Sequence, residues 1–365
     1  MPHSAAFQTA PAHSARLRVL ATVAWLACCS SAPAAVFAQY PDQAVILQYH
    51  HVSTSTPPVT SLSEEAFRTH MAYLADNDFT VLPLEDVIEA LREGNPLPDR
   101  TAVITFDDGY TSVYEVAMPI LADYNWPYTV FVTSGLVGSN DRLYATWDQL
   151  NAMGEAGATL ANHTVSHPYL LARKLGMTDS QWLDSVREEI VAAEEQIREH
   201  TGQNHKLLAY PYGEYNTAIQ ALVEELGFVG IAQHSGPINA ASDFTALPRF
   251  PFSGIYASMN TYPTKVRSLA FDGVSVSPKS RVTSDNMPAA ELDFSDDQEG
   301  IRQLACFNNN ENMEISELDG DAKQYRISTR VDNRSRRFRY NCTAPGRNGR
   351  YYWYSVPWIN PAIAE

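Results

Sequence analysis

Short apolar runs alternate with amphipathic stretches from residue 44 to about residue 252, and this alternation strongly constrains the fold. The apolar runs have the length and composition of buried strands, and the stretches between them carry helical periodicity. Strands that alternate with helices form parallel sheets covered by those helices. Six or more such units over this length favour a barrel rather than an open sheet. The predicted fold class is therefore α/β, with an irregular (β/α) barrel.

The helix boundaries follow from local residue chemistry. Ser61 is predicted to cap the helix over 64–74, and Gly94 is predicted to end the helix over 84–92. The predicted helices cover residues 64–74, 84–92, 113–123, 147–155, 180–200 and 216–226. The predicted strands cover residues 45–47, 101–106, 128–132, 159–161, 206–209, 229–232 and 246–250.

The first 38 residues have the layout of a cleavable export signal. Arg16 and Arg18 precede an apolar stretch over 19–29, and small residues then lead to Ala38. The apolar stretch is short for a membrane span, so a membrane anchor is the less favoured alternative. Acylation of Cys28 or Cys29 would need a better match upstream. We expect export to the periplasm or the extracellular space, with no transmembrane segment after cleavage.

The pattern of residue types along the chain changes after Phe252. Residues 253–275 are expected to close the barrel irregularly, and residues 276–365 alternate polar and apolar positions in the manner of a small all-β domain. The expected organisation is a signal peptide at 1–38, a catalytic domain at 39–275 and a β-sandwich-like domain at 276–365. In an oxidising compartment Cys306 and Cys342 are expected to form a disulfide, the alternative being two buried thiols.

Composition limits the class of partner. The formal net charge of −16 argues against nucleic acid as the main partner and disfavours a purely electrostatic hold on anionic membrane. With 45% hydrophobic and 19% charged residues, the chain is ordinary for a globular protein. The sequence does not determine the oligomeric state.

Chemistry-bearing residues follow three of the predicted strands. Thr105-Phe106-Asp107-Asp108-Gly109 ends one, His163-Thr164-Val165-Ser166-His167 follows another, and Tyr210-Pro211-Tyr212-Gly213 follows a third. In a parallel barrel the carboxyl ends of the strands open onto one face, so these segments would converge there. One Asp with two His is a suitable ligand set for a divalent metal, which leaves the second Asp as a base. Taken singly, each motif is more often a turn or an incidental pair.

Together these motifs resemble the first three motifs of the polysaccharide deacetylases, the NodB-homology or carbohydrate esterase family 4 enzymes. The opening Tyr49-His50-His51-Val52 and the string Ala209-Tyr210-Pro211-Tyr212-Gly213-Glu214 further resemble the branch that deacetylates poly-β-1,6-N-acetylglucosamine. The resemblance covers roughly residues 44–252. It implies a NodB-type barrel and a hydrolase acting on carbon–nitrogen amide bonds other than peptide bonds.

The resemblance also implies roles for individual residues. Asp108, His163 and His167 match the metal ligands. Asp107 matches the catalytic base that deprotonates the water bound to the metal, and the backbone N–H of Tyr212 matches a group that stabilises the oxyanion. Zn²⁺ suits the nitrogen ligands, and Co²⁺, Ni²⁺ or Fe²⁺ would fit as well.

Two positions depart from the family pattern. Ala209 stands where many members have an Arg that orients the catalytic Asp, and Arg249 is a candidate to supply that guanidinium from a later strand. The alternative for Arg249 is an ordinary surface Arg. His234 is the best candidate for the general acid, with a polar loop His as its alternative, and His50 is a further residue able to line the site. Trp147 is more often a core residue than a wall for a sugar ring.

The leading hypothesis is an exported, metal-dependent hydrolase that removes N-acetyl groups from N-acetylglucosamine units of a polysaccharide and releases acetate. The alternatives keep the site and change the substrate to peptidoglycan, chitin oligomers or an O-acetyl ester. A non-catalytic carbohydrate-binding protein is the alternative from a different class. Arginines and aromatic residues in the last ninety or so residues are interpreted as a solvated strand face over packed rings, with carbohydrate binding as the minority view.

Overall fold

Parallel strands form the central sheet of the computed structural model, which describes residues 42–139, 143–295 and 298–364. In spatial order β1, β5, β6, β7, β8 and β9 lie side by side, each parallel to the next. All of their residues are buried, as expected for strands covered on both faces. These strands are β1 (Gln43–Tyr49), β5 (Thr101–Phe106), β6 (Tyr128–Val132), β7 (Ala158–Asn162), β8 (Leu207–Ala209) and β9 (Val229–Ile231).

The segment around Leu247 to Pro251 connects the two ends of this row of strands. Leu247 bridges Ile231 of β9, and β11 (Phe250–Pro251) pairs in parallel with β1. The short strands β4 (Thr80–Val81) and β10 (Ile238–Asn239) add to β5 and β1, the latter in antiparallel fashion. The pairings therefore run around an α/β sheet of irregular, barrel-like connectivity, in agreement with the predicted class.

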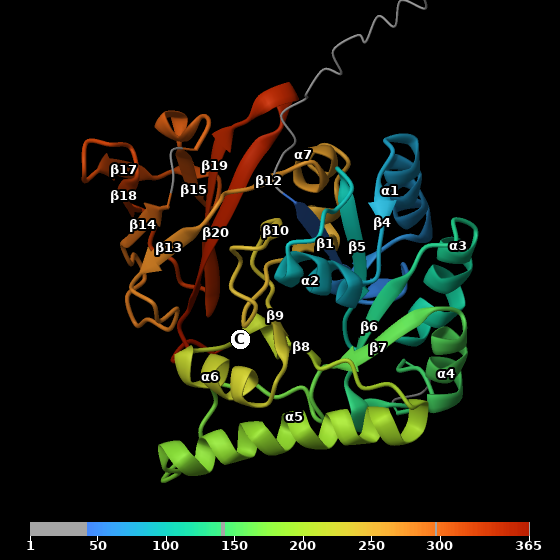
Figure 1. The fold of residues 1–365 in the computed structure, drawn as a ribbon. Helices are drawn as coiled ribbons and strands as arrows, with labels where there is room; N and C mark the ends of the chain where they lie inside the picture. Colours follow the sequence, from blue (N-terminus) through green and yellow to red (C-terminus); the bar gives the residue numbers. More distant parts are fainter. Residues whose placement is uncertain (1–41, 140–142, 296–297, 365) are drawn as a thin grey trace, which may run out of the picture. The chain divides into compact units, whose positions relative to one another are not determined.

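Helices separate the strands as the sequence periodicity indicates (Figure 1). The helices are α1 (Glu64–Asp76), α2 (Leu84–Glu93), α3 (Met118–Ala122), α4 (Trp147–Glu155), α5 (Asp179–Thr201), α6 (Thr217–Glu225) and α7 (Tyr262–Val266). Gly94 ends α2 in a left-handed conformation, as predicted. The prediction for the cap of α1 was wrong: Ser63, not Ser61, accepts from the Ala66 N–H, because Ser61 lies in the short strand β3 (Ser61–Leu62), paired with β2 (His51–Val52).

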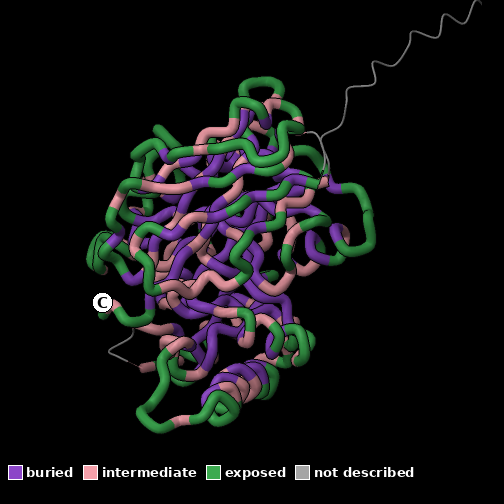
Figure 2. The backbone as a smooth tube through the Cα atoms, turned by 90° about the vertical axis from the view of Figure 1, so that its left-hand side faces the viewer, coloured by how far each residue is buried: buried purple, intermediate pink, exposed green. Residues whose placement is uncertain are grey.

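Buried residues gather in the interior of the molecule, and exposed residues gather toward its periphery (Figure 2). Helix α5 packs one side against the sheet through Trp182, Val186 and Ile190, whose spacing is that of a single helical face. Within the described residues, no helix combines the length and apolar character that crossing a bilayer requires.

Two further sheets follow the parallel one, and their strands are mostly antiparallel. One sheet has the order β12 (Leu269–Ala270), β20 (Tyr351–Ile359), β19 (Arg337–Pro345), β15 (Ala305–Asn308) and β16 (Glu311–Asn312). The other has the order β13 (Val274–Ser277), β14 (Ala290–Phe294), β18 (Gln324–Ser328) and β17 (Glu314–Glu317). Pairing with these sheets begins at Leu269, ahead of the expected boundary at residue 276.

A disulfide joins Cys306 of β15 to Cys342 of β19, which are directly opposite each other in neighbouring strands. The bond therefore lies within one sheet rather than between the two. Both cysteines are buried in a second core, separate from the core of the parallel sheet. The expected export signal, residues 1–38, lies outside the described residues.

Candidate metal centre and active site

Three residues predicted as metal ligands meet at the carboxyl ends of β5 and β7. The Oδ1 atom of Asp108 lies 3.3 Å from Nε2 of His163 and 3.3 Å from Nε2 of His167. One ligand atom from each of the three lies within 4.8 Å of the others. The parallel sheet thus brings together residues that are far apart in the chain, in the way the strand-end argument predicts.

The state of the histidines suits metal binding. His163 Nδ1–H donates to the carbonyl of Ala209 at 2.8 Å, and because a carbonyl only accepts, the proton is on Nδ1. The other nitrogen, Nε2, is buried and has no hydrogen-bond partner among the described residues. Burial and the neighbouring His163 lower the pKa of His167 to about 4, so its imidazole is neutral near pH 7. A lone pair directed at a shared point is the arrangement that a divalent cation requires.

Left-handed backbone conformations turn these side chains toward one another. Asp108 and Gly109 have φ values of 73° and 75°, which direct the chain sharply out of β5. His167 has a φ of 54° at the end of the loop after β7. Glu189 of α5 holds that loop by accepting from the N–H groups of Val165 (3.0 Å) and Ser166 (2.9 Å). The candidate metal centre is therefore built on left-handed turns that are supported from a helix.

Asp107, the predicted base, is completely buried beside the three ligands. Arg249 donates to both of its carboxylate oxygens, at 2.7 and 2.9 Å, and Gln48 Nε2 donates to Oδ2 at 2.7 Å. Burial by itself would raise the pKa of Asp107, but the charge of Arg249 outweighs that effect and lowers the pKa to about 2. Asp107 is therefore ionised throughout the neutral range.

The Arg that the sequence lacks at position 209 is replaced in space by Arg249, whose guanidinium contacts Asp107. Its side chain is fully buried, and its Nε donates to the carbonyl of Ala232 while NH1 also reaches Thr105 Oγ1. Of the two interpretations of Arg249, the geometry therefore favours the guanidinium that orients Asp107 over the surface Arg. The bidentate contact fixes the carboxylate plane as well as its charge.

Tyr212 lies in the tight turn after β8, with a left-handed φ of 57°. Its ring packs edge-on against His167, with centroids 4.4 Å apart, and stacks on Tyr169. The next-but-one residue, Glu214, is fully buried and accepts from Arg336 at 2.6 and 2.9 Å and from Arg337 at 3.1 Å. This turn is thus held beside the metal ligands by arginines that belong to and precede β19.

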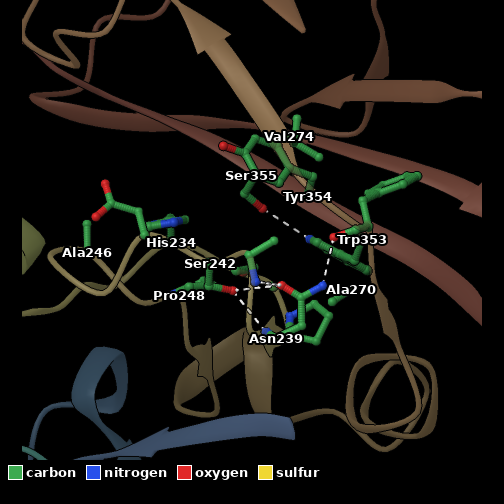
Figure 3. Close-up of a pocket in the computed structure, with 16 residues that line it drawn as sticks. His234, Asn239, Ser242, Ala246, Pro248, Ala270, Val274, Trp353, Tyr354 and Ser355 are labelled. Carbon is green, nitrogen blue, oxygen red and sulfur yellow. Dashed lines mark hydrogen bonds between the residues drawn. The ribbon is translucent and has the colours of Figure 1, made fainter. Parts of the chain in front are cut away.

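His234, the predicted general acid, makes no hydrogen bond or ion pair with Asp107 or the three candidate ligands among the described residues, although it lines a cleft together with Tyr212. It lines a pocket of about 190 Å³ together with residues of β12, β20 and the 235–248 segment (Figure 3). None of Asp107, Asp108, His163 and His167 lines that pocket. Burial, together with the charges of Arg281 and Arg339, lowers the pKa of His234 to about 3. Near pH 7 it is neutral, which does not suit a proton donor.

His50 is the histidine that lies beside the base. Its Nε2 is 3.9 Å from Asp107 Oδ2, and its Nδ1 is buried without a hydrogen-bond partner among the described residues. Its position directly after β1, in the string Tyr49-His50-His51-Val52, was the sequence signal for it. Gln48 and Glu189 were missed by the sequence analysis, because nothing in a lone polar residue on a strand or helix reveals a long-range hydrogen bond.

Trp147 packs as a core residue does, and it does not form a wall beside the candidate ligands. It is half-buried at the first position of α4 and stacks on His200 of α5, with ring centroids 4.3 Å apart. The contact joins two helices outside the cluster of ligands, and the residue packs against the core of the parallel sheet.

Comparison with known proteins agrees with this geometry. A family model described as "Polysaccharide deacetylase" matches residues 94–231, which include Asp107, Asp108, His163, His167 and Tyr212. The chain is 27% identical over 241 residues to the poly-beta-1,6-N-acetyl-D-glucosamine N-deacetylase of Escherichia coli (strain K12), covering 56% of this chain and 36% of that protein. It therefore spans only about a third of that relative's length.

A second relative and a solved structure extend the comparison. The poly-beta-1,6-N-acetyl-D-glucosamine N-deacetylase of Staphylococcus epidermidis is 28% identical over 197 residues, covering 48% of this chain and 66% of the relative. The structure of the Streptococcus pyogenes deacetylase PplD in complex with acetate superposes with a TM-score of 0.53 at 25% identity. That match covers 59% of this chain and 94% of PplD.

Proposed function

The chain contains a polysaccharide deacetylase domain, and from this premise we propose that it is a metal-dependent N-deacetylase of an N-acetylglucosamine polysaccharide. It would release acetate and leave free amines on the polymer. The observation that supports the proposal is the convergence of Asp108, His163 and His167 beside the Arg249-bound carboxylate of Asp107. The names of the E. coli and S. epidermidis relatives support poly-β-1,6-N-acetylglucosamine as the substrate.

Asp108, His163 and His167 would hold the cation, since their ligand atoms converge and Nε2 of His163 lacks another partner among the described residues. When bound, a divalent metal polarises an amide carbonyl and lowers the pKa of water. Zn²⁺ fits this nitrogen and oxygen set, and Co²⁺, Ni²⁺ or Fe²⁺ would also fit.

Asp107 would accept the proton of the attacking water. Its ionised state is maintained by Arg249, and its Oδ1 atom accepts only the Arg249 hydrogen bond among the described residues, so one acceptor position is left for water. Asp107 and Asp108 are assigned different roles because their neighbours differ. His163 and His167 lie next to Asp108, whereas the guanidinium of Arg249 hydrogen-bonds to Asp107. The backbone N–H of Tyr212 is proposed to stabilise the oxyanion, from a turn that packs on His167.

His50 is our candidate for the proton donor to the leaving amine. It lies 3.9 Å from Asp107, whereas His234 makes no ion pair with Asp107 among the described residues and has a pKa of about 3. The two grounds for a non-catalytic carbohydrate-binding protein were the missing Arg at position 209 and the uncertain acid. Arg249 and His50 supply residues for both roles.

Export after cleavage near Ala38 and the division at residue 276 remain proposals that accompany this function. They rest on the sequence layout of residues 1–38 and on the change from parallel to mostly antiparallel strands near Leu269.

The test is acetate release from a panel of purified substrates, namely poly-β-1,6-N-acetylglucosamine, chitin oligomers, peptidoglycan and an O-acetylated polysaccharide, with and without chelator. We expect release from the first substrate and its loss on metal removal. Asp107→Asn should lower turnover by roughly a hundredfold or more while metal content stays intact, because only the proton acceptor is removed. Asp108→Asn should lose both metal and activity.

Wild-type turnover by Asp107→Asn would contradict the assignment of the base. Preference for another member of the panel would replace the substrate while leaving the metal site in place. Chelator-resistant activity would refute the metal dependence.

A further inference from the structure

A cleft of about 370 Å³ opens next to the proposed active site. Tyr212 and Gly213 form one end of it, and the ring of Tyr212 contacts that of His167 at a centroid distance of 4.4 Å. The remaining walls come from residues 233–234, 255–256 and 309–310, from Ser335, and from β19 and β20 of the mostly antiparallel sheet. The cleft therefore begins at Tyr212, one ring contact away from the candidate ligand His167, and continues along β19 and β20.

Strand β19 presents a polar face to this cleft. Arg337, Arg339 and Asn341 alternate with the buried residues Phe338 and Tyr340, so the three polar side chains lie on the same side of the strand. Ser355 Oγ donates to Oδ1 of Asn341 at 2.7 Å, which leaves the amide nitrogen as the group to donate to a ligand.

An exposed aromatic ring completes the wall. Tyr256 is 43% exposed, and its neighbour Ile255 is 85% exposed. The guanidinium of Arg339 lies 5.3 Å from the centroid of the Tyr256 ring. A ring next to hydrogen-bond donors is the combination that binds a pyranose, through stacking on its C–H face and bonds to its oxygens.

The two arginines of the cleft, Arg337 and Arg339, differ in whether a carboxylate neutralises their charge. Arg337 is paired with buried Glu214, whereas Arg339 makes no ion pair with any carboxylate in the part of the chain that the structure describes. Burial lowers the pKa of Arg339, which is the effect of removing water from a charge. A half-buried guanidinium without a carboxylate partner can donate hydrogen bonds to a neutral acceptor such as an acetamido oxygen, and it repels a second cation.

We propose that this cleft binds the sugar unit adjacent to the one undergoing deacetylation, and that it selects an N-acetylated unit over one with a free amine. Tyr256 stacks on the ring, and Arg339 and Asn341 donate to its acetamido and hydroxyl oxygens. Because a deacetylated unit carries an ammonium group, Arg339 repels it, so free amines are spaced along the product rather than clustered. The inference rests on the proposed function and assigns part of the substrate site to β19.

The experiment compares wild type with Arg339→Met, which removes the charge and the donors but retains an unbranched apolar chain. Arg326→Met is the matched control, since Arg326 lies on β18 in the other sheet and is exposed. The substrates are a fully acetylated β-1,6-linked N-acetylglucosamine hexamer and an aryl acetate that occupies only the catalytic centre. We expect Arg339→Met to lose about tenfold in kcat/KM on the hexamer and less than threefold on the aryl acetate, with Arg326→Met like wild type on both.

Mass-spectrometric sequencing of partly deacetylated hexamer tests the charge selection. Adjacent free amines should be rare in wild-type product and should approach the random frequency with Arg339→Met. Arg339→Lys should keep the spaced pattern, because it keeps the charge. If Arg339→Met misfolds and therefore loses turnover of the aryl acetate, Arg339→Lys and Asn341→Ala are compared with wild type on the hexamer instead.

The outcomes separate this inference from the proposed function. If wild type releases no acetate from the hexamer, the proposed function fails. If wild type is active and Arg339→Met matches it in both kcat/KM and product pattern, the adjacent-unit site is refuted while the deacetylase remains. An unchanged pattern with reduced kcat/KM would refute the selection against free amines and retain the binding site.

Discussion

Two adjacent carboxylates acquire different properties from their immediate neighbours. Asp107 is the last residue before the chain turns, and it points to Arg249 and Gln48. Asp108 has a left-handed φ of 73° and points to His163 and His167 instead. The proposed base and the candidate metal ligand can therefore be consecutive residues, because one turn in the backbone separates their environments.

Arg249 controls the ionisation of Asp107, and Arg249→Met should reveal this in the pH dependence. The positive charge holds the pKa of Asp107 down at about 2, so its removal raises that pKa. Asp107 is then protonated, and inactive as a base, at a higher pH than in wild type. We expect the acid limb of the kcat/KM profile for acetate release to move to higher pH, whereas Arg249→Lys should move it less. An unmoved acid limb in Arg249→Met would contradict this role.

His50 and His234 provide a matched pair of histidine substitutions. His50→Gln should lower kcat by roughly a hundredfold, the range of a lost general acid, because His50 lies beside Asp107. His234→Gln should retain kcat within about threefold, since this histidine is neutral near pH 7 and makes no hydrogen bond or ion pair with Asp107 or the candidate ligands among the described residues. Steady-state kinetics on the acetylated polymer measure both. The reverse ranking would restore His234 as the acid.

At the scale of elements, helix α5 supports the loop that carries two of the ligands. Glu189 accepts from two backbone N–H groups and from Ser166 Oγ, all within the His163 to His167 loop. Asn162, at the end of β7, donates to the carbonyl of Ile190 and so ties the strand to the same helix. The histidine spacing is therefore set by a helix that contributes no ligand.

Glu189→Ala should weaken metal binding by about tenfold, as supporting residues around metal ligands commonly do. The loop would lose three hydrogen bonds while the ligands themselves remain. The neighbouring Glu188 is exposed and provides the control, since Glu188→Ala should bind metal like wild type. Competition with a chromogenic chelator measures the affinity. Equal affinities of the two variants would show that the loop holds its shape without α5.

At the scale of the whole molecule, the mostly antiparallel sheets contact the parallel part at both ends of its strands. Arg336 binds buried Glu214 beside the Tyr212 turn, at the carboxyl ends. Arg350 binds Asp99 at 2.8 Å just ahead of β5, at the opposite end. Only the first contact is adjacent to the proposed active site.

The two arginines therefore distinguish positioning from general stability. Arg336→Met should lower kcat by about tenfold with metal content unchanged, because buried Glu214 would keep only its 3.1 Å contact with Arg337 and the Tyr212 turn would shift. Arg350→Met should leave kcat unchanged. Thermal unfolding of each variant measures the loss of stability separately from kcat. Equal kcat values for both variants would exclude a positioning role for Arg336.

The alternation of strands and helices and the strand-end motifs could be predicted from sequence, because burial and backbone propensity act over a few residues at a time. The three-ligand cluster and most predicted strands of the parallel sheet were recovered in this way. The exception is the strand predicted over 246–250, where only Leu247 and Phe250 pair with the sheet. The cap of α1 was misplaced by two residues, since Ser61 and Ser63 satisfy the same local rule and only the pairing of β3 decides between them.

Sequence by itself therefore determined the α/β class, the three candidate metal ligands and the adjacent carboxylate. Tertiary structure decided which guanidinium reaches Asp107, which histidine lies beside it, and which arginines hold the Tyr212 turn. These contacts join residues separated by long stretches of chain, and their energies depend on burial and on distances of about 3 Å. No local pattern encodes such distances, because they arise only when the strands have packed.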